Sequence, residues 1–291
     1  MERKAAVRGV VFALILTGWC GPTGAVLVAQ WTFDDGTAAG AGPGGTAGTL
    51  RGGVGSAPGV SGRALAFDGT GGYVDFGPPP EAISSLKQGA ISVWFQFDRT
   101  TGPADIIPIL YMGDGAGGGG HSAFVLEAGH FDPGDTKLYF TFISDNMVLP
   151  LCFDSGRNLL PGVWYNFVGV VGPNGNTGYL NGVEMTGRHY NFGNAGTSVF
   201  LDEIAKPDVF WLGRGLLASF PTEHYFSGLI DELNIYDAPL TATEIRDAYE
   251  AVMNPPTPPG TIPEPLTMVG MLVGLTAMGI RFLPRISRIP L

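Results

Sequence analysis

The chain has 291 residues and a formal net charge of −10, with 14% charged and 45% apolar residues. This balance excludes a disordered chain, and the 46 glycines and 23 prolines favour many turns and short strands over long helices. The negative charge repels phosphate backbones, so we expect no nucleic-acid partner; it suits oxygen-rich cation sites or neutral sugars.

The first 25 residues have the composition of a secretory signal peptide. Three basic residues precede a short apolar run, Val10–Leu16, and small residues follow it up to Ala25. We therefore expect export, with cleavage after Ala25. The alternative is an N-terminal membrane anchor, for which the apolar run is short. After cleavage one cysteine remains, Cys152, whose apolar neighbours Leu151 and Phe153 favour a buried, inert thiol.

Residues 26–253 have the pattern of one all-β domain. Apolar and polar residues alternate in Ile91–Phe97, as in a half-buried strand, and glycine-, proline- and asparagine-rich turns separate such runs. Asn181-Gly182 is a pair able to hold positive φ in a tight turn. The runs predict two stacked antiparallel sheets. The expected strands are residues 27–33, 49–51, 64–68, 73–76, 91–97, 106–112, 123–127, 138–143, 147–153, 164–171, 177–180, 183–186, 209–213 and 226–235.

The stretch Tyr225–Tyr249 predicts the last strand, a turn and a short amphipathic helix. Thr241 and Glu244 have the spacing of a capping box, in which each side chain accepts a hydrogen bond from a backbone N–H at the helix start. Leu240 and Ile245 have the spacing of a hydrophobic staple across that cap. The stretch is therefore expected to close a β-sandwich.

The C-terminal residues differ in composition from the domain. Residues 254–262 form a proline-rich linker, stiff and extended. The apolar run Leu266–Ile280 follows, and three arginines come after it, beginning with Arg281. As a helix this run spans about 22 Å, less than the ~30 Å hydrocarbon core of a bilayer. We expect a weak membrane segment with its arginines on the cytoplasmic side.

The domain resembles the LamG-like jelly-roll domains of the concanavalin A-like lectin/glucanase superfamily. The matching segments follow one another in family order and cover nearly all of residues 26–253, although 98–161 carry no motif of the family. The resemblance implies an all-β, two-sheet antiparallel jelly-roll sandwich with one short C-terminal helix. The segments are residues 28–36, 63–69, 73–75, 91–94, 164–183 and 228–233 with the helix after them.

Residues 263–291 resemble a PEP-CTERM sorting signal. Pro263-Glu264-Pro265 precedes the apolar run, and Arg281 begins the basic end. The resemblance implies recognition by an exosortase in the inner membrane of a Gram-negative bacterium that makes exopolysaccharide, followed by release to the cell envelope or extracellular matrix. Pro284 and the extension Ile286–Leu291 make this tail longer than the usual basic end.

No pattern in the sequence indicates catalysis. Glycosidases of the superfamily use carboxylates along one strand face, as in E-x-D-x-E, and the chain has no such run. Asp202-Glu203 and Asp231-Glu232 are adjacent pairs, whose members are expected on opposite faces of a strand. The four histidines lack zinc-ligand spacing, and Gly113–Gly118 matches G-x-G-x-x-G without the helix that a dinucleotide site needs.

Two binding sites are expected. Many domains of the superfamily hold a structural Ca²⁺, and Asp34 and Asp231 lie in terminal strands that a jelly roll places side by side. The alternative for both is hydrogen bonding at turns and strand ends. Sugars stack on exposed aromatic rings, and the rings available are Trp94, Trp164, Trp211 and Tyr111. Of these, Tyr111 beside a glycine-rich loop is the expected ligand contact. Trp31, Trp94 and Trp164 are expected in the core.

These observations predict an exported, non-catalytic jelly-roll module, carbohydrate-binding or adhesive, that is sorted to the cell envelope and has a polysaccharide as its possible ligand. One alternative is a structural matrix protein with protein partners. Another is a glycoside hydrolase on the same fold.

Overall fold

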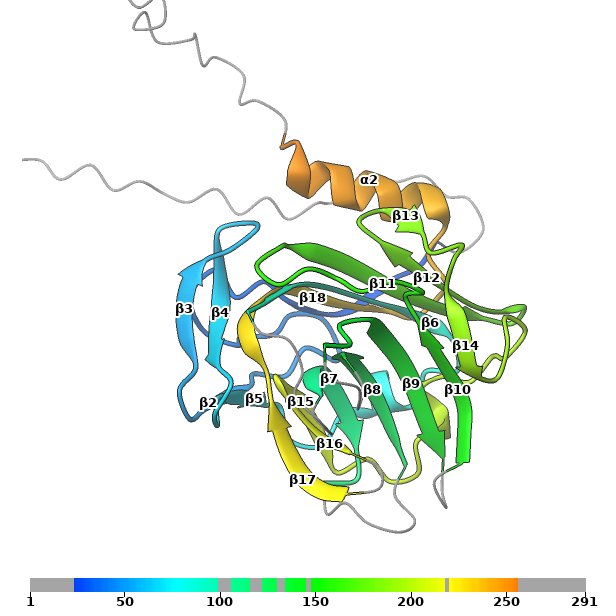
Figure 1. The fold of residues 1–291 in the computed structure, drawn as a ribbon, viewed down its shortest axis with the longest axis horizontal. Helices are drawn as coiled ribbons and strands as arrows, with labels where there is room; N and C mark the ends of the chain where they lie inside the picture. Colours follow the sequence, from blue (N-terminus) through cyan, green and yellow to red (C-terminus); the bar gives the residue numbers. More distant parts are fainter. Residues whose placement is uncertain are drawn as a thin grey trace, which may run out of the picture. The chain divides into compact units, whose positions relative to one another are not determined.

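In the computed structural model the described residues are 24–98, 106–115, 122–129, 134–144, 148–217 and 220–255. They form two antiparallel eight-stranded sheets and a separate hairpin, with one long helix near the C-terminal end of the domain (Figure 1). The expected two-sheet antiparallel sandwich is therefore confirmed. The compact unit runs to Met253.

The first sheet has β18 at its centre. Its strand order is β13-β12-β11-β6-β18-β4-β3, and β1 also pairs with β18. The expected meeting of the terminal strands is thus confirmed, with Trp31 opposite Leu233. The bounds are β1 Leu27–Trp31, β3 Gly55–Pro58, β4 Arg63–Asp68, β6 Gly89–Phe97, β11 Tyr165–Gly172, β12 Gly175–Leu180, β13 Val183–Glu184 and β18 Ser227–Tyr236.

The second sheet has the order β14-β10-β9-β8-β7-β15-β5-β2. The hairpin β16–β17 packs against β7 of this sheet. The bounds are β2 Thr49–Arg51, β5 Tyr73–Asp75, β7 Ile107–Gly113, β8 Ala123–Ala128, β9 Leu138–Ser144, β10 Val148–Asp154, β14 His189–Phe192, β15 Val209–Leu212, β16 Arg214–Leu217 and β17 Phe220–Tyr225; the helices are α1 Glu81–Ser84, the 3-10 helix η2 Leu201–Glu203 and α2 Ala242–Met253.

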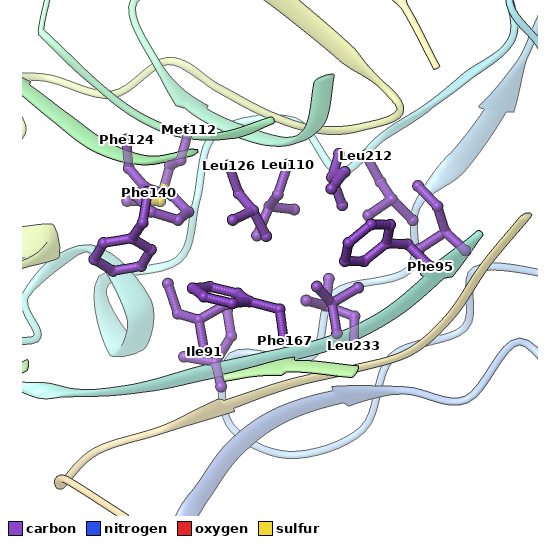
Figure 2. Packing of buried hydrophobic residues seen from close by; sticks show 14 of the residues in the cluster. Ile91, Phe95, Leu110, Met112, Phe124, Leu126, Phe140, Phe167, Leu212 and Leu233 are labelled. Atoms are coloured by element: carbon purple, nitrogen blue, oxygen red, sulfur yellow. The ribbon is translucent and has the colours of Figure 1, made fainter. Parts of the chain in front are cut away.

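The main core lies between the two sheets. Figure 2 shows Leu110 and Leu126 of the second sheet opposite Phe167 and Leu233 of the first. All four side chains are at most 1% exposed, and many phenylalanine rings pack around them. This burial of apolar surface is the main stabilising contribution to the sandwich.

The closing stretch forms as its sequence predicts, with one exception. The Oγ1 of Thr241 accepts a hydrogen bond from the N–H of Glu244, and the Glu244 carboxylate accepts one from the N–H of Thr241. These bonds confirm the capping box at the start of α2. The exception is a β-bulge between Asp231 and Asn234, where Glu232 has a φ of 49°.

Most strand predictions are confirmed to within two or three residues. The tight turn at Asn181-Gly182 has φ of 53° and 74°, as expected. Four strands were not predicted: β3, β14, β16 and β17. The turn Gly69–Gly72 joins strands that do not pair, because β4 lies in the first sheet and β5 in the second.

The predictions for the ends of the chain fall largely outside the described residues. This applies to the signal peptide up to residue 23, to the linker beyond Pro255, and to Pro263, Glu264, Pro265 and Arg281 of the expected sorting signal. Among the helices that the structure describes, none is long and apolar enough to cross a membrane.

Candidate functional site

The outer face of the second sheet carries an aromatic cluster. Side chains alternate along a strand, so the residues on either side of a core-facing residue point to this outer face. Tyr111, Trp211 and Val125 belong to the cluster, and Leu216 of the hairpin β16–β17 packs onto it. The hairpin thus covers part of the face that a sandwich would otherwise expose to solvent (Figure 1).

An arginine lies at the edge of this cluster, between two rings. The guanidinium carbon of Arg214 is 4.0 Å from the centroid of the Trp211 ring and 4.8 Å from that of the Tyr73 ring. These distances are within the range of cation–π attraction. The rings of Tyr73 and Tyr225 lie 6.3 Å apart, and both residues are partly exposed. The arginine thus packs against the buried Trp211 ring on one side, and the partly exposed Tyr73 and Tyr225 rings lie toward solvent.

One carboxylate holds the arginine and a tyrosine together. The Glu223 carboxylate accepts hydrogen bonds from the Arg214 guanidinium, at 2.5 Å, and from the Tyr225 hydroxyl. Burial and this hydrogen bond raise the pKa of Tyr225 to about 12. Arg214 also lies directly opposite Tyr225 in the β16–β17 ladder. We call Tyr73, Trp211, Arg214, Glu223 and Tyr225 the arginine–aromatic patch.

A second ion pair borders the arginine–aromatic patch. The Nη2 of Arg51 is 3.5 Å from the Oδ2 of Asp75. The strand register places Arg51 opposite Tyr73, and Asp75 opposite Trp211. Partly exposed rings, guanidinium groups and carboxylates thus share one surface, a combination that suits the ring faces and hydroxyls of a sugar.

The structure does not place Tyr111 where the sequence suggested. Its side chain has no exposed surface, and its ring stacks on Trp211 with centroids 5.4 Å apart. Its hydroxyl donates a hydrogen bond to the carbonyl oxygen of Asp114, and burial raises its pKa. The prediction of an exposed ring at Tyr111 is wrong, because the hairpin covers this part of the sheet. Tyr73 and Tyr225 are the rings that reach solvent.

The outer face of the first sheet is covered differently. The helix α2 lies over it, and the Ile245 side chain is buried against Val168 and Val170 (Figure 1). Trp94 stacks on Tyr249 of the helix with centroids 5.3 Å apart and ring planes 9° apart. Trp94 is therefore buried as expected, although it lies outside the main core.

Asp34 and Asp231 come together at one loop. The Oδ1 of Asp34 accepts a hydrogen bond from the N–H of Arg63, and the Oδ2 of Asp231 accepts bonds from the N–H groups of Val60 and Ser61. These bonds agree with the alternative to a calcium site, in which Asp34 and Asp231 stabilise a turn and a strand end by hydrogen bonding. They also bring two carboxylates to the same place, as a cation site requires.

Burial makes this group of carboxylates unusual. The pKa of Asp231 is raised to about 7 by burial, partly offset by its backbone hydrogen bonds, and the charge of Asp34 raises it further. The pKa of Glu232 is raised to about 8 by burial and by the charges of Asp231 and Asp34. The expectation that Asp231 and Glu232 face opposite sides of a strand assumed regular alternation, which the bulge at these residues interrupts.

These carboxylates fit a hard cation in chemistry. Ca²⁺ binds carboxylate and carbonyl oxygens, and a positive charge would relieve the repulsion between Asp34 and Asp231. Over the part of the chain that the structure describes, no three His, Cys, Asp or Glu side chains form a metal-binding group. A calcium ion here would therefore need backbone carbonyls or water as further ligands. Asp34 and Asp231 are the residues that would hold it.

Polar residues elsewhere on the second sheet are deeply buried. Glu127 and Asp154 are 4% and 2% exposed, and both face Tyr139 in the strand register. Cys152 is buried as expected, and burial raises the pKa of its thiol to about 11. These groups lie beneath the surface, so a polysaccharide does not reach the two carboxylates in this conformation.

Of the arginine–aromatic patch, the sequence pattern pointed only to Trp211, as one of the rings available to a sugar. Tyr73 and Trp211 lie inside predicted strands, but Arg214, Glu223 and Tyr225 lie in or beside the hairpin, which was not predicted. Gly213, which lies between β15 and β16, is the one local mark of a break before the hairpin, and the alternation after it is too irregular to predict two strands.

Comparison with curated protein sequences gives no match. Among solved structures, domain 4 of AbnA, a GH43 extracellular arabinanase from Geobacillus stearothermophilus, in complex with arabinotriose, is 22% identical with a TM-score of 0.55; the match covers 77% of this chain and 98% of that one. A structure of botulinum neurotoxin type C, studied for its interaction with two ganglioside molecules, is 11% identical with a TM-score of 0.55, over 78% of this chain and 51% of that one. At these identities the likeness concerns the fold alone.

A family model described as the concanavalin A-like lectin/glucanases superfamily matches residues 68–246, which is more than half of the chain. The match includes the second sheet apart from β2, the hairpin β16–β17 and the strand β18. The chain belongs to the concanavalin A-like lectin/glucanases superfamily.

Proposed function

We propose that the protein is an exported, non-catalytic module that binds carbohydrate through the arginine–aromatic patch. The observation that carries the proposal is the patch itself. Its two tyrosine rings are partly exposed, and the Arg214–Glu223 pair is fixed between them. Such a surface is ready to bind without reordering its side chains, which favours affinity.

The chemistry of the patch matches that of a sugar. The apolar face of a pyranose stacks on an aromatic ring, and partly exposed Tyr73 and Tyr225 each offer one. Sugar hydroxyl groups both donate and accept hydrogen bonds. The Glu223 carboxylate accepts and the Arg214 guanidinium donates, so the pair serves both roles.

Relatives by fold support the same class of ligand. The domain of the arabinanase was solved with arabinotriose, and the neurotoxin structure concerns two ganglioside molecules. Both ligands contain sugars. The similarity is one of fold, so it supports carbohydrate as the ligand class for this chain and leaves the particular sugar open.

The proposal excludes catalysis for a physical reason. Hydrolysis of a glycosidic bond needs two carboxyl groups that reach the substrate. Glu127 and Asp154 are buried beneath the outer face of the second sheet. The two carboxylates at the patch, Glu223 and Asp75, are each paired with an arginine. Hydrolysis of a bound polysaccharide by the wild-type protein would contradict this part of the proposal.

We also propose calcium as a structural cofactor and an exosortase as a processing partner. Asp34 and Asp231 would hold the calcium ion, and its positive charge would relieve the repulsion between these two carboxylates. Residues 263–291 would direct the chain to the inner membrane and then to the cell envelope or extracellular matrix. Deleting Pro263–Leu291 should change the location and size of the protein in cells, and an unchanged location would argue against sorting.

A glycan array with the wild-type protein and two variants tests the binding proposal. We expect binding to at least one polysaccharide, and loss of that binding in Tyr73→Ala and Tyr225→Ala. Tyr249→Ala is the matched control, because it removes a tyrosine ring from the other outer face. The proposal fails if no polysaccharide binds, or if both patch variants bind as the wild type does.

A further inference from the structure

We propose that the arginine–aromatic patch takes an uncharged sugar and discriminates against sugars that carry a carboxylate. The inference rests on the proposed function, since it names the class of carbohydrate that the same patch would bind. An arginine in a sugar site commonly suggests an acidic ligand. Here the charges of the patch and of the domain point the other way.

The two guanidinium groups at the patch already have carboxylate partners. Arg214 is 2.5 Å from Glu223, and Arg51 is 3.5 Å from Asp75. The four groups together carry no net charge. An anionic sugar would have to displace a carboxylate from its arginine, and the displaced carboxylate would then lie beside the negative charge of the ligand.

The exposure of the Arg214–Glu223 pair strengthens this preference. The Glu223 side chain is 47% exposed and that of Arg214 is 15% exposed. At this pair a ligand approaching from solvent therefore meets the carboxylate before the guanidinium, which lies between the rings of Trp211 and Tyr73. At the Arg51–Asp75 pair the guanidinium is the more exposed group, 53% against 26%, so we assign the preference chiefly to the Arg214–Glu223 pair. Sugar hydroxyl groups can donate hydrogen bonds to this carboxylate, whereas a sugar carboxylate cannot.

The charge of the whole domain acts in the same direction. Residues 26–253 contain ten Lys and Arg against twenty-four Asp and Glu, a net charge of −14. The resulting negative potential lowers the local concentration of polyanions at low ionic strength. A neutral polysaccharide does not experience this repulsion, so its binding should depend little on salt.

The test compares one polysaccharide backbone in three forms. The neutral polymer that binds best on the array is used as it is, after oxidation of its primary alcohols to carboxylates, and after methyl esterification of those carboxylates. Affinity electrophoresis or calorimetry at about 0.01 M and about 0.15 M ionic strength gives the affinities, since screening differs strongly between these two conditions.

We expect the oxidised polymer to bind the wild-type protein at least about tenfold more weakly at low salt, because juxtaposed like charges are costly at an interface. Methyl esterification should restore most of the binding, because it removes the charge and keeps the added carbonyl group. Equal or tighter binding of the oxidised polymer would overturn the inference and leave the proposed function standing. Binding of no polysaccharide would overturn both.

A charge variant tests the role of Glu223. Glu223→Gln leaves Arg214 without its carboxylate partner, so we expect its preference for the neutral polymer to fall to within about threefold. Glu250→Gln removes the same charge from the exposed face of α2 and should keep the full preference. Should Glu223→Gln fail to fold, Asp75→Asn frees Arg51 and tests the same point. An unchanged preference in the folded patch variant would overturn the inference.

Discussion

The outer faces of the two sheets are built from the same alternating strands and differ in what covers them. On the first sheet, Trp94 lies beneath Tyr249 of α2, and apolar residues surround the buried Ile245. On the second sheet, a hairpin covers Tyr111 and leaves Tyr73 and Tyr225 partly open beside Arg214. One aromatic face is sealed by a helix, and the other is left partly open.

The difference shows that an aromatic ring on an outward strand position has no fixed role. Where a neighbouring element buries the ring completely, the ring contributes to stability. Where the ring is held by an ion pair and remains partly exposed, it can bind a ligand. Substitutions on the two faces should therefore separate stability from binding.

The largest effect is expected from the sealed face. Trp94→Ala removes a ring that is 4% exposed and stacked on Tyr249, so the free energy of unfolding should fall by about 3 kcal/mol. Denaturant unfolding measures this. Tyr73→Ala on the open face should lower stability less and abolish polysaccharide binding. If Trp94→Ala is as stable as the wild type, α2 does not seal this face.

Calcium should have the next largest effect. Removal of calcium with a chelator should lower the melting temperature by about 4–8 °C, which corresponds to about 2 kcal/mol for a domain of this size. Asp231→Asn should abolish the response, whereas Asp247→Asn, on the exposed side of α2, should keep it. If the melting temperature is the same with calcium and with chelator, Asp34 and Asp231 hold no calcium ion, and their role is hydrogen bonding alone.

Arg214→Ala tests the partly open outer face of the second sheet. The variant loses an ion pair and two ring contacts, so we expect stability to fall by about 1–2 kcal/mol. Binding of the neutral polysaccharide should weaken by at least about tenfold. Arg246→Ala on α2 is the control, and both its stability and its binding should match the wild type. If Arg214→Ala binds the polysaccharide as tightly as the wild type does, Arg214 does not contribute to the binding site.

The smallest effect is expected at Tyr111. Tyr111→Phe keeps the buried ring and removes only the hydrogen bond to the carbonyl oxygen of Asp114, so stability should fall by about 1 kcal/mol or less. Calorimetric binding to the polysaccharide should be unchanged, because the ring presents no surface to the ligand. A large loss of affinity in Tyr111→Phe would show that Tyr111 contributes to polysaccharide binding after all.

Local signals in the sequence predicted much of the fold. The turn at Asn181-Gly182 needs positive φ, and this pair supplies it. The cap at Thr241 and Glu244 follows from residues three positions apart. In both cases the physical cause lies within a few residues of its effect. The alternation in most strands likewise depends only on neighbours along the chain.

The parts that were not predicted depend on distant contacts. Tyr73 and Arg214 meet only because β5 and β15 pair and the hairpin then folds back. Glu232 in the bulge has a left-handed φ, but the sequence has no glycine or asparagine at this position to indicate it. Burial of Tyr111 follows from the hairpin, whose alternation is too irregular to identify. The pairing of β1 and β18 was anticipated, and Asp34 and Asp231 both accept hydrogen bonds from the loop before β4 or from the first residue of that strand. A calcium ion at these two residues stays a prediction.

The position of β18 has a consequence for how the protein folds. This strand lies at the centre of the first sheet, yet its partners β1, β4 and β6 all come more than 120 residues earlier in the chain. The sheet therefore cannot be completed until nearly the whole domain has been synthesised. Contacts of such high sequence separation make folding slow, because the intervening chain must be ordered first. The growing chain thus stays without its finished core until its last strand arrives.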